Sequence, residues 1–159
     1  MINKKYLRIL FVLYLLILIR VIVFKYPLER LREIAASWRE DVFWEGLHSA
    51  NFEWFRTIKM YINYWEYKEI NSFGNLIGNI LAFIPLGYML PRLTRIFENL
   101  FFCMGMGLTM VLVIELFQLY TNFGCFDVDD ILLNGLGILI GYLFFKMLSC
   151  FTRKKSLTE

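Results

Sequence analysis

The chain has 159 residues, of which 58% are hydrophobic and 19% charged, and its net charge is +3. Soluble domains average about 45–50% apolar residues, and a soluble domain of this length has too little interior to bury many more. The composition excludes a disordered protein, a disulfide scaffold and a typical nucleic-acid-binding protein. It indicates a single membrane domain over residues 1–159.

Four hydrophobic segments account for the apolar excess, and they contain only two charged residues, Arg20 and Glu115. About 20 apolar residues cross a bilayer as a helix, and an isolated strand would leave its backbone unpaired in lipid. We therefore predict an all-α, polytopic membrane protein with a four-helix transmembrane bundle. Its helices are centred on residues 9–24, 76–90, 100–120 and 131–145.

The distribution of Lys and Arg predicts the orientation. With the N-terminus in the cytoplasm, the inner segments (1–8, 91–99 and the tail 146–159) carry nine basic residues in 31 positions. The outer segments (25–74 and 121–130) carry seven in 60. The positive-inside rule favours this orientation, which leaves both termini cytoplasmic and the loop 25–74 outside.

The outer loop 25–74 is rich in Trp and Tyr and lacks the Gly/Ser runs of a flexible tether. Apolar and aromatic residues recur at helical spacing from Leu28 to Val42, and again from Ile58 to Trp65. This pattern predicts short helices lying in the outer membrane interface, where aromatic rings are favoured. A small extracellular cap packed on the bundle explains the pattern equally well.

Polar residues from all four predicted helices fall at one depth, near the outer leaflet. Within a helix they are three or four residues apart, so each pair shares one face. Ionisable groups inside a membrane usually face the bundle interior and mark a site. We predict a polar site with Glu115 and Asp130 as hypothetical catalytic groups. Its predicted binding residues are Asn75, Asn79, Gln118, Asn134, Arg20 and Asp127.

Structural roles explain several of these residues as well. Arg20 either pairs with an acidic residue or extends its guanidinium to the interface. Asp127 is either a helix N-cap or part of the site. The asparagines either bind a ligand or join helices by hydrogen bonds. Glu115 is the hardest to explain by structure alone, because a carboxylate at that depth must be protonated, paired or hydrated.

Two further features are less specific. Glu115, Asp127 and Asp130 offer the oxygen ligands that a divalent cation takes, although their spacing does not identify a metal site. Small residues are spaced to let helices approach one another closely. They lie on the second helix (Gly74, Gly78), the third (Gly105, Gly107) and the fourth (Gly137, Gly141).

Three motifs carry a family resemblance. The segment 75–87 resembles the N-x2-G-N-x3-F-x-P-x-G signature of VanZ-like membrane proteins, and 115–118 resembles their E-x-x-Q. The segment 126–142 resembles their F-D-x-D-D-x3-N-x2-G-x3-G-Y. The segment 51–58 is a looser match to N-x-x-P-F-R-[ST]-I, with Trp54 in place of the proline. The similar region spans about residues 51–145.

The resemblance implies a multi-pass protein of the bacterial cytoplasmic membrane, related to resistance to the glycopeptide teicoplanin. Many members carry an arginine just before the aspartate run, where this chain has Gly124 and Cys125. If that arginine balances the acidic cluster, Arg20 or Arg56 is left to replace it, and Arg56 is therefore added to the predicted binding residues. The family name does not specify a reaction.

The leading functional hypothesis is a protein that lowers sensitivity to glycopeptide or lipoglycopeptide antibiotics. It would act on, or bind, a lipid-linked cell-wall precursor or another amphiphilic molecule at the outer leaflet. Whether it is an enzyme stays open. The alternatives are a non-catalytic membrane scaffold and a small transporter subunit. The lipid bilayer is the expected partner, and nucleic acid is not.

Overall fold

The computed structural model describes residues 3–23, 27–66 and 70–155. The described chain is helical and contains no β-strand, which confirms the all-α prediction. Helix α1 (Lys4–Leu18) continues into a π-helical turn, η1 (Ile19–Val23). There follow α2 (Leu28–Ala36), α3 (Glu40–Ser49), α4 (Arg56–Glu66), α5 (Ile70–Leu93), a 3-10 turn η2 (Arg95–Glu98), α6 (Leu100–Thr121) and α7 (Val128–Lys155).

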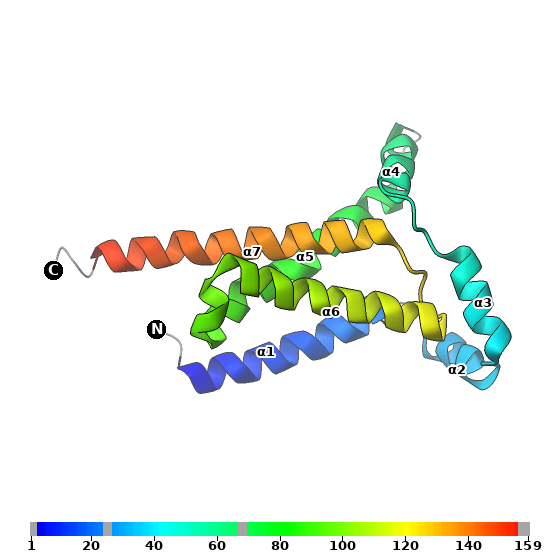
Figure 1. The fold of residues 1–159 in the computed structure, drawn as a ribbon, viewed down its shortest axis with the longest axis horizontal. Helices are drawn as coiled ribbons and strands as arrows, with labels where there is room; N and C mark the ends of the chain where they lie inside the picture. Colours follow the sequence, from blue (N-terminus) through cyan, green and yellow to red (C-terminus); the bar gives the residue numbers. More distant parts are fainter. Residues whose placement is uncertain (1–2, 24–26, 67–69, 156–159) are drawn as a thin grey trace.

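Four long helices lie alongside one another. α5 packs most extensively on α7, and α1 and α6 complete the group (Figure 1). α1 and α6 run in one direction and α5 and α7 in the other, so α1 begins at the end of the molecule where α7 finishes (Figure 1). The short helices α2, α3 and α4 lie at the opposite end, here called the site end.

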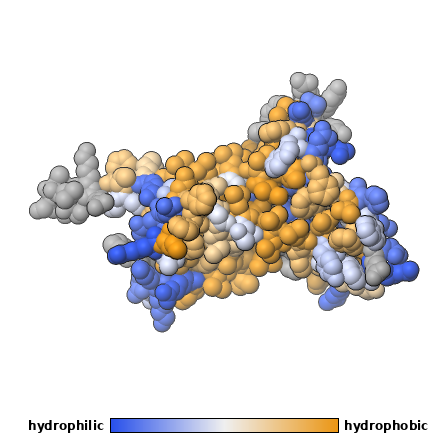
Figure 2. Space-filling model, in the orientation of Figure 1, coloured by the Kyte–Doolittle hydropathy of each residue, from blue (hydrophilic) through white to orange (hydrophobic). Residues whose placement is uncertain are grey.

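Three helices are long and apolar enough to cross a membrane, within Leu76–Leu93, Leu100–Thr121 and Val128–Thr152. Figure 2 shows a broad hydrophobic band around the middle of the long helices, with hydrophilic residues at both ends. Many large apolar side chains in this band are exposed, including Phe101 and Val113. Such a surface is stable in lipid and unfavourable in water.

Glycines allow the backbones of α5 and α7 to touch. A Cβ atom added to Gly87 would lie 1.9 Å from the Ile138 carbonyl oxygen. One added to Gly141 would lie 2.0 Å from the Ile84 carbonyl oxygen. One added to Gly137 would lie 2.2 Å from the Ile80 carbonyl oxygen, one helical turn nearer the site end of α5. α5 and α7 are therefore parallel and in close backbone contact.

The glycine prediction is only partly correct. Gly137 and Gly141 lie in the contact with α5, and Gly107 packs against the Ile138 side chain. Gly74, Gly78 and Gly105 have no atom within 4 Å of an added Cβ, because they lie on helix faces that point away from neighbouring helices. The spacing alone does not distinguish a packed face from an open one.

The outer loop forms three helices rather than two. The helical spacing from Leu28 to Val42 is interrupted where α2 ends at Ala36 and α3 begins at Glu40. α3 packs on the end of α6, where a Cβ on Gly46 would lie 2.8 Å from the Leu119 carbonyl oxygen. Between α2 and α3, the Trp38 indole donates a 3.0 Å hydrogen bond to the Tyr120 carbonyl. The contact with α6 fixes the position of α3 at the site end.

Candidate functional site

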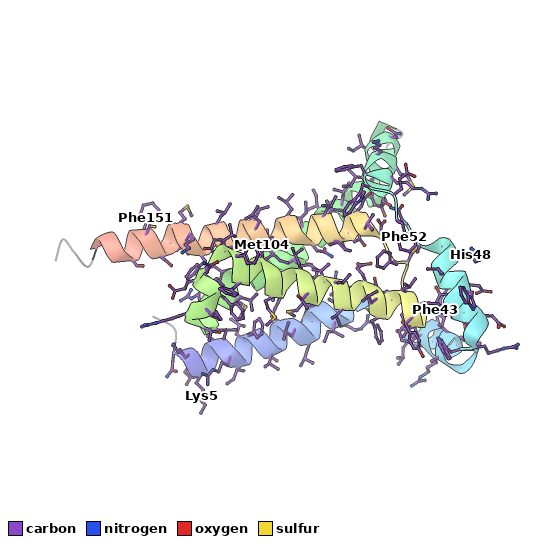
Figure 3. All side chains as sticks on the ribbon, viewed as in Figure 1. Lys5, Phe43, His48, Phe52, Met104 and Phe151 are labelled. Carbon is purple, nitrogen blue, oxygen red and sulfur yellow. The ribbon has the colours of Figure 1, made fainter. Side chains whose placement is uncertain are left out.

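Two loops that are distant in sequence pair at the site end. The Asn51 amide donates to the Phe126 carbonyl at 2.8 Å, and the Val128 amide donates to the Asn51 carbonyl at 3.1 Å. The Phe52 and Phe126 rings, 5.1 Å apart, cover this pairing, and Figure 3 shows Phe52 in the segment between α3 and α4. The start of α4 is thereby attached to the start of α7.

Asp129 is the centre of this junction and is fully buried. One carboxylate oxygen accepts from the Phe55 amide at 2.6 Å. The other accepts from the Thr57 amide at 2.9 Å and the Ile58 amide at 3.1 Å. These amides at the start of α4 have no carbonyl partner within their own helix, so a residue of α7 caps α4.

Asp127 caps its own helix. Its Oδ1 accepts from the Asp129 amide at 2.8 Å, the usual N-cap contact at the start of α7. The same carboxylate accepts from the Asn51 carboxamide at 2.8 Å and the Thr57 hydroxyl at 2.5 Å. The structure therefore supports the N-cap interpretation of Asp127 and adds a second role in holding the loop.

Phe55 has a left-handed backbone, with φ of 65°. For a bulky residue this conformation is strained, and Asp129 holds it by accepting from the Phe55 amide. The side chain itself is exposed. Removing the Phe55 ring should therefore cost little packing, so that variants at this position report mainly on the strain of the backbone.

We expect Phe55→Gly to be more stable than Phe55→Ala by about 1 kcal/mol, because glycine adopts this conformation without strain. In the interior of an ordinary helix, alanine is more stable than glycine. Thermal unfolding of both purified variants measures the difference. Equal stabilities would show that the Phe55 backbone carries no strain.

Glu115 lies inside this end of the bundle, with only 1% of its surface exposed. Its carboxylate accepts from the Asp127 amide at 3.1 Å. The contacts of Gly107 with Ile138 and of Gly135 with Leu108 set an antiparallel register between α6 and α7. Extended along both helices, this register places Glu115 level with Asp130.

The other predicted residues fall in two groups. The Asn79 carboxamide donates to the Asp130 carboxylate, which joins α5 to α7. The Gln118 carboxamide donates to the Ile22 carbonyl at 2.8 Å, which joins α6 to the π-helical turn after α1. Such turns are common at functional sites and expose carbonyls that a regular helix would use.

Two buried carboxamide oxygens have no hydrogen-bond partner in the described structure, Oε1 of Gln118 and Oδ1 of Asn134. These residues are 0% and 1% exposed. Most buried polar atoms in proteins are paired, so such exceptions call for an explanation such as a water or a ligand. They show that this end of the bundle has unused hydrogen-bond acceptors.

The remaining predictions have mixed outcomes. Arg20 lies on the π-helical turn, two residues before Ile22, and therefore at the site end. Arg56 begins α4 with an exposed side chain, and among the described residues it makes no ion pair with the carboxylates. The arrangement does not favour Arg56 as their counter-charge. The Asn75 side chain lies outside the described residues.

Cys125 lies beside the acidic residues. Its thiol donates to the Ser49 carbonyl at 2.9 Å. Partial desolvation raises the pKa of this thiol, and the negative charges of Asp127, Glu115 and Asp130 raise it further, against the opposing effect of Ser49.

Within the described residues, no group of three or more His, Cys, Asp or Glu side chains is arranged to hold a metal ion. The two oxygens of the Asp127 carboxylate already accept three hydrogen bonds, from the Asn51 carboxamide, the Thr57 hydroxyl and the Asp129 amide. The geometry thus gives no support to the divalent cation that the carboxylates suggested.

Sequence reasoning missed Asn51, Thr57 and Asp129 as members of the site. In the sequence, Asp129 is one of three clustered aspartates, and Asn51 and Thr57 lie in the predicted outer loop 25–74 with no pattern to single them out. The family resemblance could have identified them, because its segments 51–58 and 126–142 contain the residues that bond to one another. Spacing within one helix cannot reveal such a contact.

The family model VanZ/LLP1 matches residues 11–149, and so includes the second half of α1, which the motif resemblance did not reach. No curated protein and no solved structure matches the chain. Since the match covers most of the chain, the protein belongs to the VanZ/LLP1 family, and membership suggests a membrane protein related to glycopeptide resistance.

Proposed function

We propose that this protein lowers the sensitivity of a bacterium to glycopeptide or lipoglycopeptide antibiotics such as teicoplanin. It does so through a polar site in the outer leaflet that binds, or acts on, a lipid-linked or amphiphilic molecule. The observation that carries the proposal is the polar cluster at the site end, where the buried Glu115, Gln118 and Asn134 and the half-buried Asp130 come from α6 and α7. Family membership supports the link to resistance.

The proposed topology places this cluster in the outer leaflet of the cytoplasmic membrane. α1 and its π-helical turn supply a fourth span beside the three apolar helices, and both termini are cytoplasmic. In support, the beginning of α1 and the end of α7 lie at the same end of the molecule (Figure 1). The basic residues Lys4, Lys5 and Arg8 are near that end.

The short helices α2, α3 and α4 lie in the outer interface in this proposal. Large exposed apolar side chains support it, among them Leu28, Trp44 and Trp54. Phe43 lies near the end of α6, whereas His48 points outward from α3 (Figure 3). In this proposal a ligand reaches the polar cluster laterally from the outer leaflet.

Two chemical roles fit the carboxylates of the buried Glu115 and the half-buried Asp130. In a binding role, Glu115 and Asp130 attract a polar head group and the carboxamides orient it. In a catalytic role, one carboxyl group takes or gives a proton, because a buried carboxyl group is suited to general acid or base catalysis near neutral pH. Both roles require an ionisable group at Glu115.

We expect Glu115→Gln to remove most of the protection against teicoplanin, because the change keeps the shape of the side chain but abolishes its charge. The measurement is the minimal inhibitory concentration of teicoplanin for cells with matched amounts of protein in the membrane. Glu98→Gln is the matched control, since the exposed Glu98 lies on η2 at the other end of the bundle. Full protection by Glu115→Gln at normal abundance would contradict the proposed site.

A further inference from the structure

Positive charge gathers at the end of the bundle opposite the site end, here called the inner end. α1 begins there, α5 finishes there, and η2 connects α5 to α6 (Figure 1). Among the described residues of this end, Glu98 is the one acid. The basic residues are Lys4, Lys5, Arg8, Arg92, Arg95 and Lys146. The inner end is therefore positively charged and attracts anions.

Arg92 differs from the other basic residues of the inner end, which are exposed, because it is half-buried and held by Tyr88. Its guanidinium donates a hydrogen bond to the Tyr88 hydroxyl, and its Cζ lies 5.2 Å from the centre of the Tyr88 ring. An aromatic ring attracts a cation without cancelling its charge. In the described part of the chain, no carboxylate pairs with Arg92 and no second acceptor bonds to it. A guanidinium has five N–H donors, so Arg92 has donors left for a ligand with several acceptor oxygens.

An exposed apolar surface lies beside Arg92. The Tyr88 ring packs on the Phe144 ring of α7, with the ring centres 5.6 Å apart. Ile140, Phe144 and Leu148 are exposed and four residues apart, so they form one apolar stripe along α7. Arg92 is at the end of the apolar span Leu76–Leu93, whereas the stripe continues into the span of α7. A cation at the boundary of a span, beside an apolar surface, is typical of a site for a phospholipid.

The head group that fits Arg92 carries a phosphate and a net negative charge. The planar guanidinium matches two phosphate oxygens at once. A choline or ethanolamine head group adds a cation to its phosphate, and the other basic residues of the inner end repel that cation. A free phosphate ion has a suitable charge but makes no contact with the apolar stripe. A phospholipid with a net negative charge, such as phosphatidylglycerol, uses both the cation and the stripe.

We propose that Arg92, Tyr88 and Phe144 form a binding site for an anionic phospholipid at the inner end. The Arg92 guanidinium binds the phosphate, and an acyl chain lies along the stripe of α7 that contains Ile140 and Phe144. In the proposed topology this lipid belongs to the inner leaflet. The site is separate from the polar cluster at the site end, so it does not depend on the proposed function.

The test compares ligands that differ in charge and in acyl chains. Purified protein in non-ionic detergent is titrated with short-chain phosphatidylglycerol, with phosphatidylcholine of the same chain length, and with glycerol 3-phosphate. The thermal unfolding midpoint at each concentration reports binding. We expect phosphatidylglycerol to bind about tenfold more tightly than phosphatidylcholine, and glycerol 3-phosphate to leave the midpoint unchanged. Equal binding of the two lipids would overturn the proposed site. Equal binding of glycerol 3-phosphate and phosphatidylglycerol would reject a lipid as its ligand.

A pair of variants locates the binding. Arg92→Gln removes the guanidinium, so the preference for phosphatidylglycerol should fall about tenfold, to the level of phosphatidylcholine. Arg95→Gln is the matched control, because it removes the same charge from an exposed residue of the inner end. Salt screens an exposed charge, so Arg95→Gln should change the preference less than about twofold. Equal losses in the two variants would show a diffuse attraction to the basic residues, and an unchanged preference in Arg92→Gln would place the lipid elsewhere. Either result would overturn the site.

Arg92→Lys separates the charge of Arg92 from its geometry, and it also tests the site if Arg92→Gln does not fold. Lysine keeps the positive charge but cannot bind two phosphate oxygens in parallel or stack its head group flat on Tyr88. The preference for phosphatidylglycerol should therefore fall about threefold. A folded Arg92→Lys protein with the full preference would show that any cation suffices there, and would reject the contact between guanidinium and phosphate.

Discussion

Replacing Gly141 with alanine is expected to destabilise the protein by about 3 kcal/mol, because the new methyl group would overlap the backbone of α5. The added Cβ would lie 2.0 Å from the Ile84 carbonyl oxygen and 2.9 Å from the Tyr88 amide nitrogen. Both are backbone atoms of a packed helix, so neither can turn away as a flexible side chain does. α5 and α7 would have to separate along their most extensive contact.

The size of this effect comes from sterics rather than helix propensity. Alanine in a helix interior is more favourable than glycine by roughly 0.5–1 kcal/mol. The overlap therefore has to overcome a gain that acts in the opposite direction. A net loss of stability in Gly141→Ala is direct evidence for backbone contact between α5 and α7.

The chain provides matched controls for this experiment. Gly78 lies in α5 and Gly105 in α6, and an added Cβ meets no atom within 4 Å at either position. Gly78→Ala and Gly105→Ala are expected to be neutral or slightly stabilising. Unfolding in detergent and the amount of protein in the membrane measure all three variants. If Gly141→Ala is as stable as the two controls, the close packing of α5 on α7 is wrong.

The glycines illustrate what a single sequence reveals about this fold. Composition and the hydrophobic segments are sufficient to predict an all-α membrane protein, because long apolar runs have few stable alternatives. The same sequence offers small residues on three helices as contact positions. Only the helix arrangement distinguishes Gly141, which touches a carbonyl, from Gly78, which faces open space.

In the candidate site, too, sequence spacing predicts some features and only the arrangement of the helices shows the others. Helical spacing groups Glu115 with Gln118 on α6 and Asp130 with Asn134 on α7, because residues three or four apart share a helix face. Spacing cannot report contacts between segments 70 or more residues apart. The bonds from Asp129 to the start of α4 are of that kind, and they were not predicted from the residues.

The break between α2 and α3 has a local cause that periodicity does not record. The Ser37 hydroxyl bonds back to the Glu33 carbonyl, and Trp38 turns toward α6 to donate to the Tyr120 carbonyl. A serine that bonds to the preceding turn favours a helix end. The apolar spacing continues through this point, so it does not reveal that the helix ends.

Asp129→Asn is expected to destabilise the junction between α4 and α7 by about 3 kcal/mol. The buried carboxylate accepts from three backbone amides, and hydrogen bonds to a charged group contribute about 1.5–3 kcal/mol each. Asparagine keeps one acceptor oxygen and turns an NH2 group toward amides that also donate. At least one buried amide then loses its partner, and the strained Phe55 backbone loses its restraint.

Asp129→Asn should loosen the start of α4 more than it loosens the rest of the protein. Hydrogen exchange, followed by mass spectrometry of the purified protein, should accelerate at the amides of Phe55, Thr57 and Ile58 at the start of α4. Exchange in the middle of α6 should change less, because the Asp129 carboxylate bonds to amides at the start of α4. Asp41→Asn is the matched control, since Asp41 is exposed and forms a 3.5 Å surface ion pair with Arg39, a kind that contributes little.

The same variant separates the position of α4 from the chemistry of the buried cluster. Asp129 holds α4, and α4 leads into α5, which carries Asn79. If the site depends on this junction, Asp129→Asn should reduce teicoplanin protection even at normal abundance in the membrane, whereas Asp41→Asn should retain it. Rapid exchange at α4 with full protection would show that the junction stabilises the fold without positioning the site. Unchanged exchange would show that Asp129 does not cap α4.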